Sequence, residues 1–177
     1  KNVDGLMNNI ATVTHHLAEK LASHPELSFK VLEIVPTVLN GRYYYETEGE
    51  YWRLYKFIDN AHSYDVVENT KIAYEGGKAF GLFMSMLADL PANRLLETIP
   101  DFHNMEKRLD TFFRSLESNP VQRAELIPAE IEFVKNRTSQ MLTIPALVRE
   151  GKLPMRITHN DTKFNNILFN STNHAMC

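Results

Sequence analysis

The chain has 177 residues, of which 44% are apolar and 23% are charged, as is usual for a globular protein of one domain or two lobes. Its formal net charge of −3 indicates no basic surface, so nucleic acid is not an expected partner. No apolar run approaches the roughly 18 residues that a membrane-spanning helix needs, and no membrane partner is expected. The lone cysteine, Cys177, fits a reducing, cytoplasmic compartment.

The first part of the chain predicts a helix followed by antiparallel strands. Asp4 is the expected N-cap, and apolar residues recur at helical spacing until Ser23-His24-Pro25 ends the helix. A three-stranded antiparallel meander is then expected, with strands at residues 29–35, 43–45 and 50–58 and turns at Asn40-Gly41 and Glu48-Gly49. The aromatic residues of these strands suit cross-strand packing better than a nucleic-acid platform, because few basic residues lie nearby.

From about residue 63 the pattern becomes helical. One helix is expected to carry a shared face of Ala73, Gly77, Phe80, Met84 and Leu87. It also contains Gly76, Gly77 and Gly81. Each glycine costs the helix about 1 kcal/mol relative to alanine, so the close approach of a neighbouring helix is expected there. Because this glycine-rich run lies inside a periodic helix, it does not predict a phosphate-binding loop.

Two more helices complete the helical region. The first is expected to open at Pro100, with an apolar stripe of Met105, Leu109, Phe112 and Leu116. The second is expected to start near Pro128, to break or kink at Pro145 and to end before Gly151, with a face of Ile131, Val134, Thr138 and Met141. The order of elements predicts an α+β fold with a boundary between two lobes near residues 59–63.

The stretch T-H-N-D-T-K-F-N-N-I-L-F, residues 158–169, packs polar residues between two short apolar segments, of which the first, residues 155–157, is strand-like. Asp161 stands five positions before Asn166. Phosphoryl transfer from ATP to a hydroxyl needs a carboxylate that orients the attacking hydroxyl and a neutral oxygen that helps to hold Mg²⁺. Asp and Asn are also frequent in ordinary turns. The additional presence of His159 and Lys163 favours a catalytic loop of the D-x-x-x-x-N type.

This motif resembles the catalytic loop of the aminoglycoside phosphotransferase and choline kinase-like superfamily, H-G-D-x-x-x-x-N. The variant H-N-D-T-K-x-N-N is most similar to the N-acetylhexosamine 1-kinase-like branch, whose members phosphorylate the anomeric hydroxyl of N-acetylhexosamines. Softer support comes from L-M-N-N-I, G-R-Y-Y-Y-E, Y-W-R-L-Y-K-F-I and I-P-D-F-H-N. The resemblance covers nearly the whole chain. It implies a protein kinase-like fold, with part of the N-lobe at residues 1–60 and part of the helical C-lobe at residues 61–177.

The resemblance also implies roles for single residues. Asp161 would be the catalytic base, or would orient the acceptor hydroxyl, and Asn166 would be a Mg²⁺ ligand, favoured over Asn165 by its spacing. Lys163 would neutralise the transferring phosphate. His159 would be structural and bond the backbone of the loop.

The resemblance further places a hinge near residues 56–60, where Lys56, Phe57 and Ile58 would meet the adenine of ATP through backbone groups. The glycine-rich loop, the phosphate-binding lysine and the second Mg²⁺ carboxylate of such kinases are not found in this sequence. Asn8 stands where relatives tend to have Glu. The chain is therefore expected to be a fragment of a longer protein and to transfer phosphate poorly by itself.

The leading hypothesis is an ATP- and Mg²⁺-dependent phosphotransferase that acts on an alcohol group of a small molecule. A sugar is the first candidate for this acceptor. A choline or aminoglycoside kinase is the alternative within enzymes, although we can assemble no acidic pocket for a cationic acceptor. A non-catalytic pseudokinase binding module and a purely structural helical domain are the alternatives outside enzymes. His103 is expected to be a cap or surface residue rather than a substrate contact.

Overall fold

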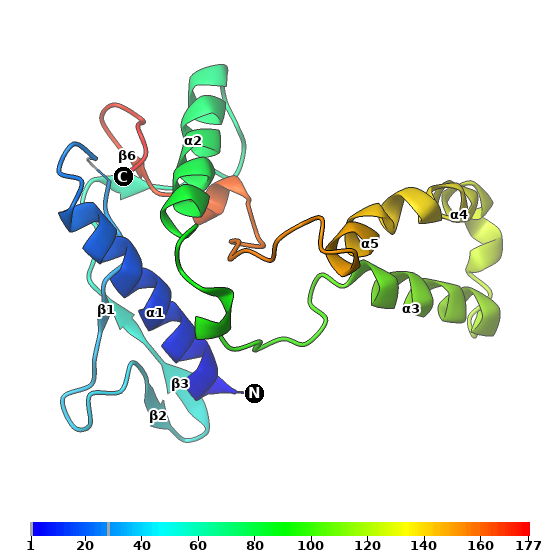
Figure 1. Cartoon of the computed structure of the whole chain (residues 1–177), viewed down its shortest axis with the longest axis horizontal. Coiled ribbons are helices and arrows are strands. Elements are labelled where there is room, and N and C mark those ends of the chain that lie inside the picture. Colours follow the sequence, from blue (N-terminus) through cyan, green and yellow to red (C-terminus); the bar gives the residue numbers. More distant parts are fainter. Residues whose placement is uncertain (1, 28) are drawn as a thin grey trace. The chain divides into compact units, whose positions relative to one another are not determined.

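The computed structural model describes residues 2–27 and 29–177 (Figure 1). The chain divides into two compact units, one formed by Lys1–Thr98 with Arg156–Cys177 and the other by Ile99–Met155. The first unit combines helices with small antiparallel sheets, and the second is helical. The arrangement is α+β, as the sequence predicts. The boundary expected near residues 59–63 lies inside the first unit, and the division into two lobes stays a prediction.

Helix α1, Val3–Ala22, opens the first unit and stops just before His24-Pro25, as predicted. Its N-cap is Asn2, whose side chain accepts a hydrogen bond from the Gly5 backbone N–H at 2.9 Å. The prediction of Asp4 as the cap is therefore wrong. The carboxylate of Asp4 instead accepts a hydrogen bond from the hydroxyl of Tyr44 at 2.9 Å, which ties the first turn of α1 to a residue 40 positions away.

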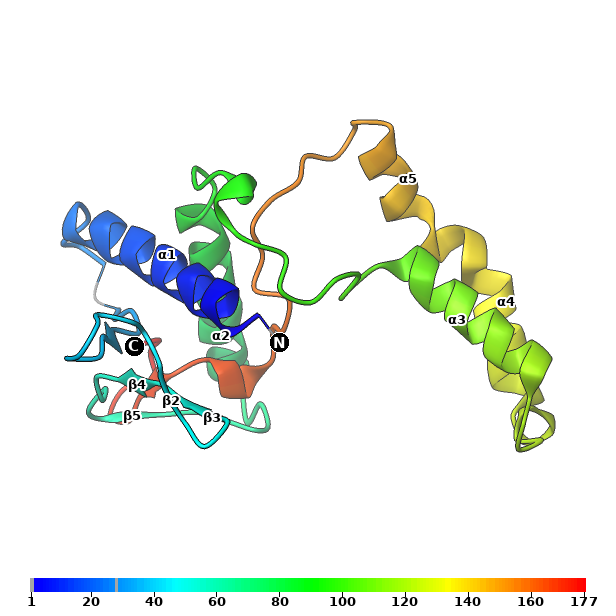
Figure 2. The same ribbon diagram turned by 90° about the horizontal axis from the view of Figure 1, so that it is seen from below.

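Among the described residues, the strands form three separate two-stranded antiparallel ladders. Figure 2 labels β2, β3, β4 and β5. The pairs are β1 (Ile34–Val35) with β4 (Leu54–Tyr55), β2 (Tyr45–Thr47) with β3 (Glu50–Trp52), and β5 (Ala61–His62) with β6 (Phe169–Asn170). The predicted three-stranded meander is wrong, because residues 43–45 do not pair with residues 29–35. Tyr44 is buried against α1 and bonded to Asp4, so β2 starts only at the next residue.

Both predicted turns form, but only one of them closes a hairpin. Glu48 and Gly49 both have positive φ, at 53° and 79°, and join β2 to β3 as a two-residue hairpin loop. The turn at Asn40-Gly41 is closed by backbone bonds between residues 37 and 41–42, and Gly41 has φ 67°. The strand predicted at residues 50–58 breaks at Arg53, where the chain changes partner from β2 to β1.

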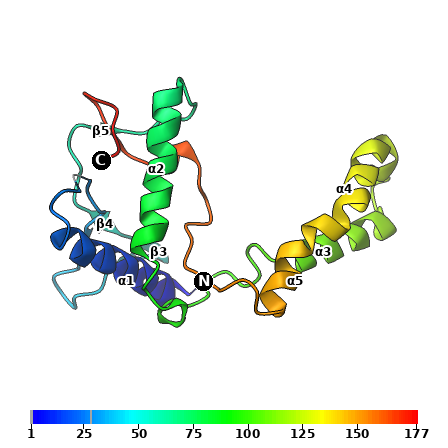
Figure 3. The same cartoon turned by 45° about the horizontal axis from the view of Figure 1, so that its top comes forward.

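Helix α2, Thr70–Met86, runs along the first unit (Figure 3). Its buried residues are Ile72, Gly76, Ala79 and Met86. The predicted face is therefore displaced. Of its members Leu87 is buried and Phe80 is half-buried, whereas Ala73, Gly77 and Met84 are exposed. Helical spacing alone could not show that the ring of Phe164, 88 positions away in the sequence, covers Gly76.

In the part of the first unit that the structure describes, three small apolar clusters hold the elements together. Leu17 of α1 packs with Met86 and Leu87 of α2. Ile72 and Ala79 of α2 pack with Ile167 and Phe169, which follow the polar stretch at residues 158–166. Met7 of α1 packs with Ile34 and Tyr44. Helix α2 is thus the element that joins α1 to the chain segment with the predicted catalytic loop.

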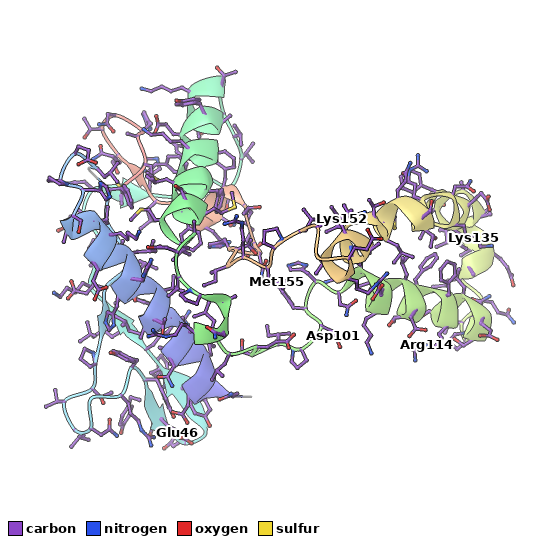
Figure 4. All side chains as sticks on the ribbon, viewed as in Figure 1. Glu46, Asp101, Arg114, Lys135, Lys152 and Met155 are labelled. Atoms are coloured by element: carbon purple, nitrogen blue, oxygen red, sulfur yellow. The ribbon has the colours of Figure 1, made fainter. Side chains whose placement is uncertain are left out.

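The second unit contains α3 (Met105–Ser118), α4 (Pro128–Met141) and α5 (Thr143–Arg149), and Arg149 pairs with Glu106. The predicted stripes are confirmed: Leu109 is buried, and the other members of both stripes are half-buried. Charged side chains such as Arg114 and Lys135 are exposed (Figure 4).

The boundaries of these helices follow the prediction only in part. Pro100 does not open α3, because Asn104 is its N-cap and accepts a hydrogen bond from Lys107 N–H at 3.1 Å. His103, one residue earlier, is exposed. The helix breaks as predicted, but at Leu142, between α4 and α5, and Pro145 lies in the first turn of α5. Gly151 follows with φ 69°. Among the described residues, no helix has the length and apolar character needed to cross a membrane.

Candidate functional site

The polar stretch at residues 158–166 leads into a single turn of 3₁₀ helix, η3 (Phe164–Asn166), and then into β6. The strand expected at residues 155–157 does not form. This segment follows Pro154, and Ile157 packs against the cluster of Leu17 and Met86, so a side chain rather than a ladder holds it. Downstream, the pairing of β6 with β5 and the burial of Ile167 fix the other end of the loop.

His159 anchors the start of the loop on α2. Its ring lies 5.5 Å from the ring of Phe80 and 5.5 Å from that of Phe83, at 67° and 71°. Both contacts are edge-to-face arrangements, which aromatic rings favour. The backbone N–H of Asp161 donates a long hydrogen bond to Nδ1 of His159, with a distance of 3.4 Å between the two nitrogen atoms. His159 therefore contacts the loop backbone, as the sequence predicts.

Asp161, Lys163 and Asn166 lie together on the exposed side of the loop. The Nδ2 of Asn166 donates to the backbone carbonyl of Asp161 at 2.8 Å and to its carboxylate at 2.9 Å. The Nζ of Lys163 is 3.5 Å from the same carboxylate oxygen. The hydrogen bond from Asn166 and, after it, the positive charge of Lys163 lower the pKa of Asp161. Asp161 is therefore an ionised acceptor at neutral pH.

The orientation of the Asn166 amide bears on metal binding. With its nitrogen turned toward Asp161, its Oδ1 has no hydrogen-bond donor among the described residues. The described residues contain no group of three or more His, Cys, Asp or Glu side chains that could hold a metal ion. Carboxylate and amide oxygens are hard ligands that suit Mg²⁺, which also retains water and binds phosphate oxygens. The donor type of the Asn166 Oδ1 therefore fits that ion.

Asn165 points to a different partner. Its Nδ2 donates to the carboxylate of Asp65 at 3.3 Å, across 100 positions of sequence. The two adjacent asparagines thus differ, since only Asn166 bonds Asp161. Sequence reasoning missed Asp65, because it lies in an irregular segment where no motif or periodicity marks it.

The predicted hinge residues have different environments. The backbone N–H of Lys56 donates to the carbonyl of Glu33 at 2.9 Å, and its side chain pairs with the Glu33 carboxylate. Phe57 is 86% exposed. Only Ile58 lines the cavity that also contains Asn166. The structure therefore brings one of the three hinge residues to the same cavity as the loop.

This cavity has a volume of about 610 Å³ and lies within the first unit. Its lining is largely apolar, with Ile10 and Val13 from α1, Phe80 from α2, and Leu168 from the segment before β6. The polar groups of His159 and Asn166 lie in its wall. A mainly apolar pocket with a few polar groups is the usual form of a small-molecule site. A smaller cavity of about 370 Å³ lies over residues 37–48 and contains no residue of the loop.

Comparison with the models of known protein families finds none that matches this chain. The loop of Asp161 and Asn166 and the adjoining cavity are therefore the features on which a functional proposal must rest.

Proposed function

We propose that the protein is an ATP- and Mg²⁺-dependent phosphotransferase that phosphorylates a hydroxyl group of a small molecule, with a sugar as the first candidate. The observation that carries the proposal is the double hydrogen bond from the Asn166 amide to Asp161, with Lys163 3.5 Å from the same carboxylate. Phosphoryl transfer depends mostly on positioning and electrostatics, and this loop holds a carboxylate, an amide and an ammonium group together.

Each side chain has a defined task in this proposal. The carboxylate of Asp161, ionised at neutral pH, accepts a hydrogen bond from the acceptor hydroxyl and orients its oxygen for attack. Asn166 holds that carboxylate in place and offers its Oδ1 to a cation. The ammonium of Lys163 offsets negative charge next to Asp161. When bound, Mg-ATP supplies the phosphoryl group and the screening of its charge.

The cavity offers a place for the nucleotide. Ile58 and Leu168 provide apolar contacts of the kind that a nucleobase needs, and Asn166 lies in the same wall. The small antiparallel ladders, the helix α1 and the position of the loop after α2 support a protein kinase-like fold. The motif H-N-D-T-K-F-N-N supports the N-acetylhexosamine 1-kinase-like branch.

The test is phosphate transfer from ATP by the protein expressed from its whole reading frame. The acceptor panel contains N-acetylhexosamines, other hexoses, choline and an aminoglycoside. Transfer to an N-acetylhexosamine is the expected result. Transfer to choline or an aminoglycoside alone would keep the phosphotransferase and reject the sugar branch. Binding of Mg-ATP without transfer to any acceptor would favour a pseudokinase, and failure to bind Mg-ATP would favour a structural domain.

A further inference from the structure

Helix α2 presents Gly76, Phe80 and Phe83 on one face, at the spacing of residues that lie above one another on a helix. Two rings of the loop lie on this face. His159 contacts Phe80 and Phe83, and the ring of Phe164 lies over Gly76. A Cβ atom at Gly76 would lie 2.6 Å from Cζ of Phe164 and 2.7 Å from its Cε1. Only glycine therefore leaves room for this ring.

The ring of Phe164 is also held by a second aromatic residue. It stacks on Phe169, with ring centroids 6.1 Å apart and planes 5° apart. Phe169 is fully buried and makes an edge contact with Tyr64, with centroids 5.2 Å apart. Phe164 thus lies between the backbone of α2 and a fixed ring. A larger residue at position 76 would have to displace Phe164.

Displacement of Phe164 would be transmitted directly to Asn166. Phe164 is the first residue of the η3 turn, and Asn166 is the last. Backbone bonds from Asn166 N–H to Lys163 and from Ile167 N–H to Phe164, both 3.0 Å, define this turn. The same turn aims the Asn166 amide at Asp161. The position of one aromatic ring therefore fixes the turn that carries the amide.

We propose that Gly76 and Phe164 are positioning residues whose contact sets the Asp161–Asn166 geometry of the loop. Neither residue is catalytic. The link to phosphate transfer rests on the proposed function, whereas the link to the Asn166 side chain does not. This contact also explains why position 76, one of the three glycine positions of α2, is occupied by glycine. Apart from neighbouring residues and the backbone of α2 itself, no described atom lies within 4 Å of a Cβ placed at Gly77 or Gly81.

The test compares Gly76→Ala with Gly77→Ala, which makes the same chemical change one position along the same helix. The first readout is the side-chain amide signal of Asn166 in an NMR spectrum, which needs no activity. We expect Gly76→Ala to shift this signal and speed its exchange with solvent, and Gly77→Ala to leave it as in the wild type. If phosphate transfer is detected, Gly76→Ala should lower kcat roughly tenfold to hundredfold, with a much smaller change in KM for ATP.

A second pair of variants separates a steric contact from a general loss of folding. Phe164→Leu with Gly76 intact should shift the Asn166 signal, and Gly76→Ala combined with Phe164→Leu should recover most of the wild-type signal. An unchanged Asn166 signal in Gly76→Ala, or a double variant no closer to wild type than Gly76→Ala, would overturn the inference. Lack of phosphate transfer by the wild-type protein expressed from its whole reading frame would reject the proposed function, and the Asn166 signals would still decide this inference.

Discussion

The side-chain amide of Asn166 donates to both the backbone carbonyl and the carboxylate of Asp161, at 2.8 Å and 2.9 Å. One amide group thus closes a ring over five positions of sequence and fixes the direction of the carboxylate. A hydrogen bond to the charged form of an acid stabilises that form and lowers its pKa. The pair therefore makes predictions about protonation that need no assumption about the substrate.

Replacement of Asn166 by Ala should raise the pKa of Asp161 toward its ordinary value of 3.8, because the bond from Asn166 is the main cause of the lowered pKa. Since the folded state has the lower pKa, any stability from this bond is present above pH 3.8 and is lost as the pH falls through the folded-state pKa. A pH titration of the Asp161 carboxyl carbon by NMR measures the change.

The matched control for this titration is Asn165→Ala. Asn165 bonds Asp65 rather than Asp161, so its loss should leave the Asp161 titration unchanged. Equal midpoints in the wild type and in Asn166→Ala would show that the amide does not act on the carboxylate.

Phe169→Ala should lower the free energy of unfolding by about 3–5 kcal/mol, the usual cost of removing a large buried ring. Phe169 is fully buried, with 0% of its surface accessible to water. Urea unfolding measures the effect. Phe57→Ala is the control, because Phe57 is 86% exposed and its loss should change stability by no more than about 0.5 kcal/mol. Similar costs for the two variants would contradict the packing described for Phe169.

Asn69→Ala should cost about 0.5–2 kcal/mol through loss of the N-cap of α2. The side chain of Asn69 accepts a hydrogen bond from Ile72 N–H at 3.0 Å. Asn69→Ser should keep most of the stability, because a serine hydroxyl accepts the same bond. Denaturant midpoints of the three proteins measure the difference. A serine variant as unstable as the alanine variant would show that capping is not what Asn69 contributes.

The existence of the long helices could be predicted from the sequence, but the buried face of α2 and the start of α3 could not. The stripes of α3 and α4 follow from helical spacing alone. The first residue of α1 could not be predicted in this way, because Asn and Asp are both good N-caps. The choice of Asn2 over Asp4 depends on Tyr44, which is 40 positions away from Asp4. The hydroxyl of Tyr44 donates a hydrogen bond to the carboxylate of Asp4, and Asn2 rather than Asp4 caps the helix.

The strand pairing could not be predicted for a similar reason. Each ladder has two or three residues per strand, so local propensity contributes little to the choice of partner. In the site, the spacing of Asp161 and Asn166 was visible in the sequence, and the structure brings these residues together. The contact of Gly76 with Phe164 joins residues 88 positions apart, and no periodic pattern reveals it.

Catalysis by Asp161 is tested most directly by the rate of phosphate transfer of Asp161→Asn in the protein expressed from its whole reading frame. We expect a loss of roughly 10²–10⁴-fold in kcat, with Mg-ATP still bound and the fold intact. Asp110→Asn is the matched control. It removes the same charge from the exposed pair with Arg114 on α3 and should transfer phosphate at the wild-type rate. Transfer by Asp161→Asn at the rate of the control would contradict the role of this loop in catalysis.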